Sequence, residues 1–384
     1  MRFPEFSGEW EKCKFGDIAT GFDYGMNAAA KPFDGENKYI RITDIDEASS
    51  TYNDTDIVSP DGSLTDNYVV NDRDILLART GASTGKSYLY RKSDGKLYYA
   101  GFLIRANVTE HNPYFVFSQL HTHRYWRWVS IMSARSGQPG INSQEYSSFP
   151  IFTTSLHEEN KIASLLSRLD ERIATQNKII EDLKKLKSAI VEMLLCNRNS
   201  ELLKLGDIGY FVRGLTYANE DVTENKAATA VIRANNLNYG NHVDKGEVVY
   251  VSRTPATSQI LQKGDIVICM ANGSSALVGK NSYYPFNDGQ STVGAFCGIY
   301  RTSHPLAKWL MQSRRYKRLV YQSLQGGNGA IANLNGDDIL NMSFPVMEKE
   351  KSKSIIFILE TIEKSLAVNK GLQRSYSTQK SHLL

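Results

Sequence analysis

The sequence is poor in cysteine and has no long apolar segment. Its four cysteines, Cys13, Cys196, Cys269 and Cys297, lie far apart and form no C-x-x-C pair, which argues against a zinc site and against a disulfide framework. The densest apolar run, IIFIL at 355–359, is much too short to cross a membrane. The first residues, MRFPEFSGEWEKCKFGD, contain no apolar signal core. We therefore expect a soluble, reduced, cytoplasmic protein.

Length and charge leave several classes of protein open. The 384 residues are enough for two or three domains, and 41% hydrophobic with 22% charged residues is ordinary for a globular chain. The net charge of +4 permits an anionic partner without requiring one. His121 and His123 form an H-x-H pair, but no other ligand type lies near them in the sequence. We expect ordinary surface histidines and no metal site.

The segment LLARTGASTGKSYLY at 76–90 is similar to a phosphate-binding loop but lacks its spacing. The pattern G-x-x-x-x-G-K-[ST] needs a glycine at position 80, which is Thr80, and Gly81 lies one residue too close to Gly85. A helix should follow such a loop, whereas SYLYRKS is typical of a strand. The sequence also lacks a glycine-rich cofactor turn and an Asn-Pro-Pro-Tyr-type catalytic stretch. These absences argue against an NTPase and against a methyltransferase.

The chain contains an internal repeat of about half its length, with an offset that drifts only from 190 to 195 residues. Each half consists of about 150 residues with mixed α/β character and a helical segment after them. Two copies of one domain imply two copies of one task. The repeated pairs are KFGDI at 14–18 and KLGDI at 204–208, RDILLARTGASTGK at 73–86 and KGDIVICMANGSSALVGK at 263–280, NPYFVFSQLHTHRYWRW at 112–128 and HPLAKWLMQSRRYKRLV at 304–320, SGQPGIN at 136–142 and GGNGAIAN at 326–333, and FPI at 149–151 and FPV at 344–346.

In both copies an apolar strand leads into a loop rich in Gly, Ser and Thr, and then into Gly-Lys. The loop spacing differs, Gly81 to Gly85 against Gly273 to Gly279, and a phosphate cradle would not tolerate that difference. We interpret the loops as contact loops, whose glycines allow close approach and whose polar side chains meet phosphates or base edges. A solvent-exposed hairpin turn remains the alternative. The candidate residues are Arg79, Thr80, Ser83, Thr84 and Lys86 in the first copy and Asn272, Ser274, Ser275 and Lys280 in the second.

After Phe149-Pro150 the sequence changes to a heptad repeat, which predicts a helix over 157–195, roughly 58 Å long at 1.5 Å per residue. Its outer faces are too polar for it to stand alone, and a matching seam recurs near the C-terminus, 193 residues later. The predicted seam comprises Ile162, Leu166, Leu169, Ile173, Gln176, Ile180, Leu183, Lys187, Ile190 and Leu194 in the first helix and Ile355, Leu359, Ile362, Leu366, Asn369, Gln373, Tyr376, Lys380 and Leu383 in the second.

Chain order predicts that the second helix runs back along the first, with one domain at each end of the pair and an approximate two-fold axis. Gln176 and Asn369 occupy matching seam positions. We predict that they face each other and fix the register, as buried polar seam residues do. Gly371 should weaken the second helix by about 1 kcal/mol relative to alanine.

DNA suits this arrangement, because the paired readers of a two-fold protein meet inverted half-sites. Basic and aromatic residues alternate in HTHRYWRWV at 121–129 and QSRRYKRLV at 312–320, in helices that we expect to begin at Asn112-Pro113 and His304-Pro305. The alternative is a solvated outer face with Tyr125, Trp128, Leu319 and Tyr321 in the core. Asn and Gln in the glycine-rich loops can read adenine, although turns use them too. The candidate DNA contacts are Arg124, Arg127, Arg135, Arg314, Arg315, Lys317 and Arg318, with Gln138, Asn142, Gln325, Asn328 and Asn333 from those loops.

Over essentially its whole length the chain resembles the DNA specificity subunit of type I restriction-modification systems. The resemblance rests on RFPEFSGEWEKCKFGDIA, LLARTGASTGK, SGQPGINSQEYSSFPI leading into ENKIASLLSRLDERI, and the half-length repeat. It implies an α+β fold of two similar mixed α/β target recognition domains, residues 1–156 and 199–347. An antiparallel two-helix coiled coil, formed by spacer helices at 157–198 and 348–384, should separate them with pseudo-two-fold symmetry.

The resemblance also implies a function. Each domain would read one half of a bipartite site in double-stranded DNA, and the helices would fix the spacer. This chain would be non-catalytic and bind no cofactor; the helices would dock two methyltransferase subunits, which bind S-adenosylmethionine, and motor-nuclease restriction subunits would join the complex. TTSLHEEN, with Asn160 where Gln is common, and MEKEKSKS depart from the family's pattern. A coiled-coil scaffold with two protein-binding end domains remains the alternative.

Overall fold

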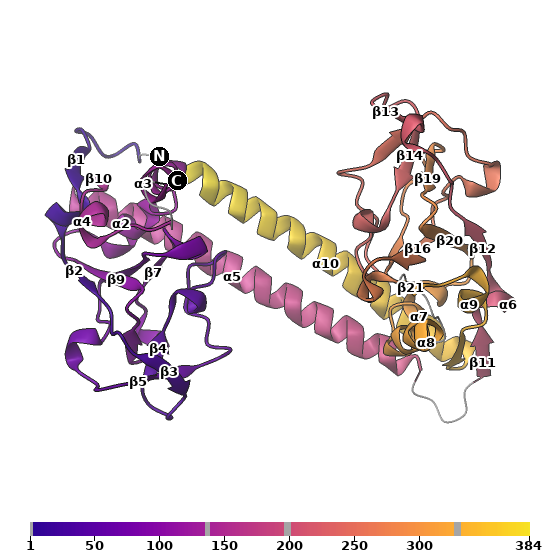
Figure 1. Ribbon diagram of the computed structural model, residues 1–384, viewed down its shortest axis with the longest axis horizontal. Helices are drawn as coiled ribbons and strands as arrows, with labels where there is room; N and C mark the ends of the chain where they lie inside the picture. The colour runs from indigo at the N-terminus through magenta and orange to yellow at the C-terminus, as the bar shows by residue number, and fades with distance from the viewer. Residues whose placement is uncertain (1–2, 135–138, 196–200, 326–331) are drawn as a thin grey trace. The chain divides into compact units, whose positions relative to one another are not determined.

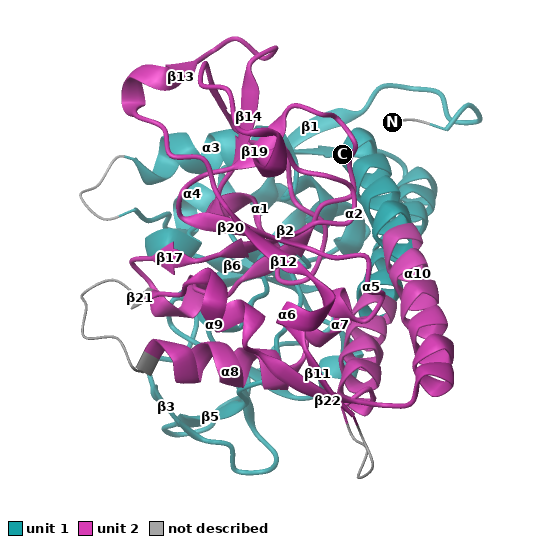
Figure 2. Cartoon of the chain, turned by 90° about the vertical axis from the view of Figure 1, so that its right-hand side faces the viewer, with its two compact units in different colours: residues 1–178, 369–384 teal, residues 179–368 magenta. Residues whose placement is uncertain are grey.

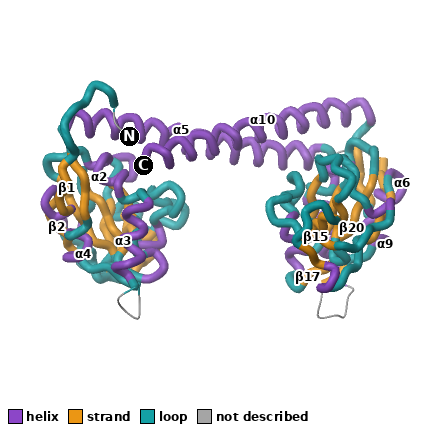
Figure 3. The backbone as a smooth tube through the Cα atoms, turned by 90° about the horizontal axis from the view of Figure 1, so that it is seen from above, coloured by secondary structure: helices purple, strands orange, loops and turns teal. Residues whose placement is uncertain are grey.

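The computed structural model describes residues 3–134, 139–195, 201–325 and 332–384. The chain forms two compact units (Figure 2). The first consists of residues 1–178 and 369–384, and the second of residues 179–368. Two long helices, α5 (Leu156–Met193) and α10 (Lys349–Leu383), each contribute to both units and are drawn as continuous helices in Figure 3. Among the described residues, no helix combines the length and the hydropathy of a membrane span.

The first unit is built on an antiparallel sheet of four strands in the order β2-β9-β6-β7. Its central strand β6 is the DILLA segment of the repeat, and all five residues are buried. The end strands β1 and β10 pair antiparallel, while β4 and β8 form a parallel pair. The strands are β1 (Glu11–Lys14), β2 (Ala19–Tyr24), β3 (Ala29–Pro32), β4 (Lys38–Ile40), β5 (Val58–Asp61), β6 (Asp74–Ala78), β7 (Ser87–Leu89), β8 (Leu97–Tyr99), β9 (Leu103–Val108) and β10 (Pro150–Thr153).

Short helices pack against this sheet and close the core of the first unit. Ile75 and Leu77 of β6 and Ile104 of β9 share one buried cluster with Tyr125 and Val129. Burying these apolar side chains is the main stabilising contribution in the unit. The helices are α1 (Phe15–Ile18), α2 (Pro113–Gln119), α3 (His123–Ser133) and α4 (Ser143–Ser147) (Figure 1).

The second unit repeats this topology. Its main sheet has the order β12-β20-β16-β18, its end strands β11 and β22 pair antiparallel, and β14 lies parallel to β19. The strands are β11 (Glu201–Lys204), β12 (Tyr210–Arg213), β13 (Val222–Thr223), β14 (Thr229–Ile232), β15 (Val249–Val251), β16 (Ile266–Cys269), β17 (Ala271–Asn272), β18 (Asn281–Tyr283), β19 (Ser291–Val293), β20 (Cys297–Arg301), β21 (Ala332–Asn333) and β22 (Ser343–Val346). The helices are α6 (Leu205–Ile208), α7 (Ala307–Leu310), α8 (Arg314–Gln325) and α9 (Gly336–Leu340). The fold is therefore α+β, with two similar mixed domains, as the repeat predicts.

The long helices run antiparallel within each unit. In the first unit, Asp170 of α5 pairs with Lys380 of α10 at 2.6 Å, and the Arg172 guanidinium lies 5.6 Å from the Tyr376 ring centroid. Residue numbers thus rise along one helix as they fall along the other. In the second unit, Ile180 of α5 packs with Ile362 and Leu366 of α10 in one cluster.

Every predicted seam position is buried or half-buried in the structure. The contact of Arg172 with Tyr376 places Gln176, one turn further along α5, level with Gln373 on α10. The Gln176 side-chain oxygen is buried and has no hydrogen-bond partner among the described residues. That Gln176 faces Asn369 stays a prediction.

The starts of the basic helices differ from the prediction. The segment after Asn112-Pro113 forms two helices, α2 and α3, and the basic residues lie on the second. Thr122 begins α3 because its side chain accepts a hydrogen bond from the Tyr125 N–H. Ser313 likewise accepts from the Tyr316 N–H at the start of α8. In each domain a hydroxyl cap begins the basic helix.

Candidate nucleic-acid interface

Three segments that the sequence singled out converge in the first domain. The contact loop after β6, residues 79–86, lies beside the glycine-rich segment at 139–142. The Gly81 N–H donates to the Pro139 carbonyl and the Ile141 N–H donates to the Arg79 carbonyl, each at 3.0 Å. Thr80 and Gly140 form an isolated bridge. These backbone bonds join the two segments into one surface.

The second domain has the same junction. Its contact loop, residues 270–280, begins with β17, which pairs antiparallel with β21 of the glycine-rich segment. The Leu334 N–H donates to the Met270 carbonyl at 2.7 Å, as the Ile141 N–H does to Arg79 in the first domain. The duplication therefore preserves the hydrogen bonds that bring the motifs together.

The glycines at the ends of the contact loops lie against the basic helices. The Tyr125 hydroxyl of α3 donates to the Gly85 carbonyl at 2.8 Å, and the Tyr316 hydroxyl of α8 donates to the Gly279 carbonyl at 2.9 Å. Both glycines have positive φ, 93° and 80°. A Cβ would lie 2.8 Å from Val129 Cγ1 at Gly85 and 2.7 Å from Val320 Cγ1 at Gly279. Their role is close packing against a helix.

The contact-loop candidates of the first domain differ in exposure. Thr84 is buried, and its hydroxyl donates to the Gly81 carbonyl at 2.8 Å, so it supports the loop. Arg79 is half-buried, and its Nε donates to the Gly101 carbonyl at 3.0 Å. Thr80 and Ser83 are half-buried, and Lys86 pairs with the exposed Glu47 at 3.2 Å.

The contact loop of the second domain is the more exposed. Ser274 and Ser275 are exposed, and the Asn272 side-chain oxygen accepts from the Ser274 N–H at 3.0 Å. The Lys280 ammonium lies 5.1 Å from the Tyr239 ring centroid. Neither contact loop leads into an α-helix, because the strands β7 and β18 follow Lys86 and Lys280 directly. The rejection of a phosphate-binding loop agrees with this structure.

Two of the candidate arginines, Arg124 and Arg315, are half-buried and make contacts within their own domains. The Arg124 guanidinium lies 4.4 Å from the Phe152 ring centroid, donates to Gln119 at 3.2 Å, and has a pKa lowered by burial. The Arg315 Nε donates to the Ser343 carbonyl at 2.8 Å. Both arginines hold their helices against the strand that leads to the next long helix.

The other basic residues of α3 and α8 lie on the outer surface. Arg127 is exposed on α3, and Arg314, Lys317 and Arg318 are exposed on α8. Tyr321, assigned to the core in the alternative interpretation, is also exposed. The core positions of α8 are instead Tyr316 and Val320, which match Tyr125 and Val129 of α3.

The asparagine candidates divide between capping and exposed positions. The Asn142 side chain accepts from the Glu145 N–H and begins α4, and Asn335 does the same for Asp338 in α9. The capping pattern N-x-x-E in NSQE could have revealed this from the sequence. Asn333 is exposed on β21. Arg135, Gln138 and Asn328, together with the side chain of Gln325, lie outside the described residues.

His121 is not an ordinary surface histidine. Its Nδ1 lies 3.0 Å from the Phe117 carbonyl and its Nε2 lies 2.9 Å from the Ser50 hydroxyl. Burial lowers the pKa of His121 to about 4, so the ring is neutral near pH 7. His123 is exposed. Over the described ranges, no three His, Cys, Asp or Glu side chains come together as a metal site.

The sequence did not single out two exposed phenylalanines beside the contact loops. Phe102 and Phe296 are 56% and 70% exposed. The Arg79 guanidinium lies 5.9 Å from the Phe102 ring centroid and 4.8 Å from that of Tyr24. In the second domain a concavity of about 550 Å³ adjoins Phe296 and Asn272. The exposure of these two rings could not be predicted from the sequence, because each lies in a turn that contains a glycine and not in a periodic helix or strand pattern.

Comparisons with known proteins agree with this geometry. Residues 7–185 match the family model described as type I restriction modification DNA specificity domain. The type I restriction enzyme EcoKI specificity subunit of Escherichia coli (strain K12) is 29% identical over 150 residues, 36% of this chain and 31% of that protein. The StySPI specificity subunit of Salmonella potsdam gives the same identity and the same coverage. The chain thus spans about a third, 31%, of the length of these curated relatives.

Solved structures extend the similarity of fold to the whole chain. The S subunit of a type I restriction-modification system from M. genitalium has a TM-score of 0.64 and 15% identity, covering 98% of this chain and 95% of that one. A chain from a structural study of the assembly and conformational transition of the type I R-M system has a TM-score of 0.52 and 14% identity, covering 100% and 95%. Residues 7–185 thus match the type I restriction modification DNA specificity domain, and the whole chain has the fold of type I restriction-modification S subunits.

Proposed function

We propose that this chain is the sequence-specific DNA-binding subunit of a type I restriction-modification complex, and that each domain reads one half of a bipartite site in double-stranded DNA. The observation that carries the proposal is the convergence, in both domains, of a contact loop, a basic helix and a glycine-rich segment. As a specificity subunit the chain selects the sequence, and catalysis belongs to its partners.

The surface offers both kinds of contact that DNA recognition needs. Exposed cations on the basic helices would meet phosphates, which supply affinity but carry no sequence information. Polar side chains of the contact loops and of β21 would reach base edges, where sequence is read. The phosphate candidates are Arg127, Arg314, Lys317 and Arg318, and the base candidates are Ser83, Asn272, Ser274, Ser275 and Asn333.

The paired long helices would fix the spacer between the half-sites and dock two methyltransferase subunits. Three exposed apolar residues on α5, Ile179, Leu186 and Met193, recur at seven-residue intervals outside the seam. An apolar stripe with heptad spacing favours a partner helix. S-adenosylmethionine would bind the methyltransferase subunits, and restriction subunits would join the same complex.

The salt dependence of DNA binding tests the DNA-reading role. For the full chain, the logarithm of affinity for duplex DNA should fall steeply with the logarithm of salt concentration. Arg127→Ala and Arg318→Ala should each weaken binding to any duplex and reduce the slope by about one. Arg168→Ala changes an exposed arginine of α5 and should leave both quantities unchanged. A flat salt dependence of the wild-type chain would favour a coiled-coil scaffold with protein-binding domains.

Partner docking is tested by a charge in the apolar stripe. Leu186→Glu places a carboxylate among Ile179 and Met193, and should abolish co-purification with methyltransferase subunits while the salt slope for DNA stays that of the wild type. Lys184→Ala, an exposed neighbour on the same helix, is the matched control. An intact complex with Leu186→Glu would exclude this stripe as the docking surface.

A further inference from the structure

We propose that Phe102 and Phe296 make apolar contacts with thymine methyl groups in the major groove, one in each half of the DNA site. The inference rests on the proposed function and assigns a base-contacting role to two residues. None of the polar loop residues described above would make an apolar contact with a base. Thymine is the base that presents a methyl group in that groove.

The backbone holds the two phenylalanines at equivalent places. Each is the third residue of a tight turn, in which the Leu103 N–H donates to the Ala100 carbonyl and the Cys297 N–H to the Gly294 carbonyl, both at 2.8 Å. The Phe102 carbonyl accepts from the Arg79 N–H at 3.0 Å, and the Phe296 carbonyl from the Met270 N–H at 2.8 Å. Each turn is thereby fixed to the first residue of a contact loop.

Exposure of these rings requires a reason. A phenylalanine left in water forgoes the favourable free energy of burial. A single exposed ring is ordinary, but here both copies of a duplicated domain expose one at the same turn, although their neighbours in sequence differ. The repeated feature is therefore apolar surface beside a contact loop.

The surroundings of each ring favour a base edge over a purely apolar partner. In the first domain the Arg79 guanidinium lies 5.9 Å from the Phe102 ring centroid, and its Nε is held by the Gly101 carbonyl. In the second domain the concavity of about 550 Å³ beside Phe296 is also lined by Arg233, Asn235 and Asn272. Guanidinium and amide groups match the N7, O6 and N6 groups of purines, and an apolar group matches the thymine methyl.

The two neighbourhoods differ, and this predicts two different half-sites. Arg79 of the first domain corresponds to Met270 of the second, because each donates its N–H to the phenylalanine carbonyl and accepts from the glycine-rich segment. The charged group near Phe296 instead comes from Arg233. Each phenylalanine should therefore affect one half-site and leave the other unchanged.

The experiment selects bound sequences from a pool of random duplexes with the full chain. The wild type should enrich a bipartite motif. Phe102→Ala should relax the preference for thymine at one position of one half-site, and Phe296→Ala should do so in the other half. Replacing that thymine by uracil, which removes only the methyl group, should weaken wild-type binding about fourfold, the effect of one buried methyl. The same replacement should not affect the matching alanine variant.

Controls separate this inference from the proposed function and from loss of folding. Phe33→Ala and Phe286→Ala change exposed phenylalanines away from the contact loops, one in each domain, and should leave the motif unchanged. Phe102→Leu and Phe296→Leu keep an apolar side chain and should retain sensitivity to uracil. If the wild type enriches no motif, the proposed function fails. If the wild type enriches a motif and both alanine variants enrich the same motif with the same sensitivity to uracil, only this inference is overturned. The same holds if the alanine variants weaken binding to all duplexes equally.

Discussion

At the scale of single residues, the glycines that end the contact loops combine two constraints. Gly85 and Gly279 have left-handed backbones, and a Cβ at either would meet a valine of the basic helix below 3 Å. We predict that Gly85→Ala and Gly279→Ala each lower the free energy of unfolding by about 1–3 kcal/mol, from strain and overpacking together. Chemical denaturation of the full chain measures this effect.

Gly273→Ala is the matched control for these substitutions. Gly273 lies in the same contact loop as Gly279, its φ is not in the left-handed region, and nothing lies within 4 Å of an added Cβ. We expect its stability to stay within about 0.5 kcal/mol of the wild type. If Gly85→Ala were as stable as the wild type, the contact loop would not be held tightly against α3.

The sequence predicted the motifs of the interface better than the orientation of single side chains. The repeat predicted that loop, helix and glycine-rich segment belong together, because those segments recur in order. It did not distinguish Arg124, which lies against Phe152, from the exposed Arg127 three residues later. Both are arginines on one amphipathic helix, and which of them points outward depends on where the helix begins. That start was misplaced because the Thr122 cap was not recognised.

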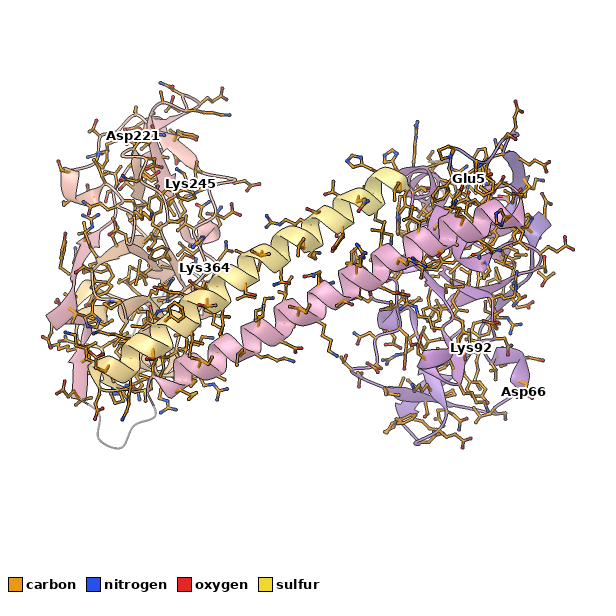
Figure 4. All side chains as sticks on the ribbon, turned by 180° about the vertical axis from the view of Figure 1, so that it is seen from behind. Glu5, Asp66, Lys92, Asp221, Lys245 and Lys364 are labelled. Carbon is orange, nitrogen blue, oxygen red and sulfur yellow. The ribbon has the colours of Figure 1, made fainter. Side chains whose placement is uncertain are left out.

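At the scale of elements, Glu363 joins three helices in the second unit. Its carboxylate lies 2.9 Å from Lys187 Nζ of α5 and 2.7 Å from Lys308 Nζ of α7, and Glu363 itself is on α10. Burial raises its pKa, but the attraction and hydrogen bonds of the two lysines outweigh burial, so the net pKa is below 4.5. Its exposed neighbour Lys364 is labelled in Figure 4.

The direction of this shift predicts a pH dependence. A carboxylate whose folded pKa lies below its unfolded value stabilises the fold above about pH 4.5, and that stabilisation is lost as pH falls through the folded pKa. Glu363→Gln should lower the free energy of unfolding by about 1–3 kcal/mol at pH 7, since two charged hydrogen bonds are lost. Urea titrations of both proteins should converge below pH 4.5.

The control for Glu363 is Glu360→Gln, which changes an exposed carboxylate one turn earlier on α10. Glu360→Gln should change the free energy of unfolding little, both at pH 7 and below pH 4.5. A constant difference between Glu363→Gln and the wild type from pH 7 to pH 3 would mean that the junction does not depend on the charge of this carboxylate.

The long helices were the elements most readily predicted, because the heptad period of the apolar residues is enough to identify a helix-pair seam. The predicted start and end, 157 and 195, compare with the observed α5 from Leu156 to Met193. The buried or half-buried pattern follows the heptad positions through both helices. The ion pairs of Glu363 could not be foreseen, since Lys308 lies on α7, outside the repeating pattern.

At the scale of the whole molecule, the duplication would allow the proposed DNA-contacting surfaces and the long helices to be changed independently. Each domain contains its own contact loop, basic helix and core, and the antiparallel contacts between α5 and α10 are described within each unit. If the helices set the distance between half-sites, a change in helix length that keeps the seam should alter the spacer alone.

We predict that inserting seven residues in α5 beside Gln176 and seven in α10 beside Asn369 lengthens the recognised spacer. Seven residues preserve the heptad phase and add about 10.5 Å of helix, the rise of about three base pairs. Both half-sites should stay the same, because no contact loop is altered. The enriched motif from a pool of random duplexes measures spacer and half-sites together.

Insertion into only one helix is the control. It shifts the apolar residues of α5 past their partners on α10 by two turns, and should lower stability without giving a defined longer spacer. If the double insertion changed the half-sites, the helices would take part in reading bases. If it left the spacer unchanged, the distance between the half-sites would depend on the domains themselves, and the helices would serve only to connect and dock.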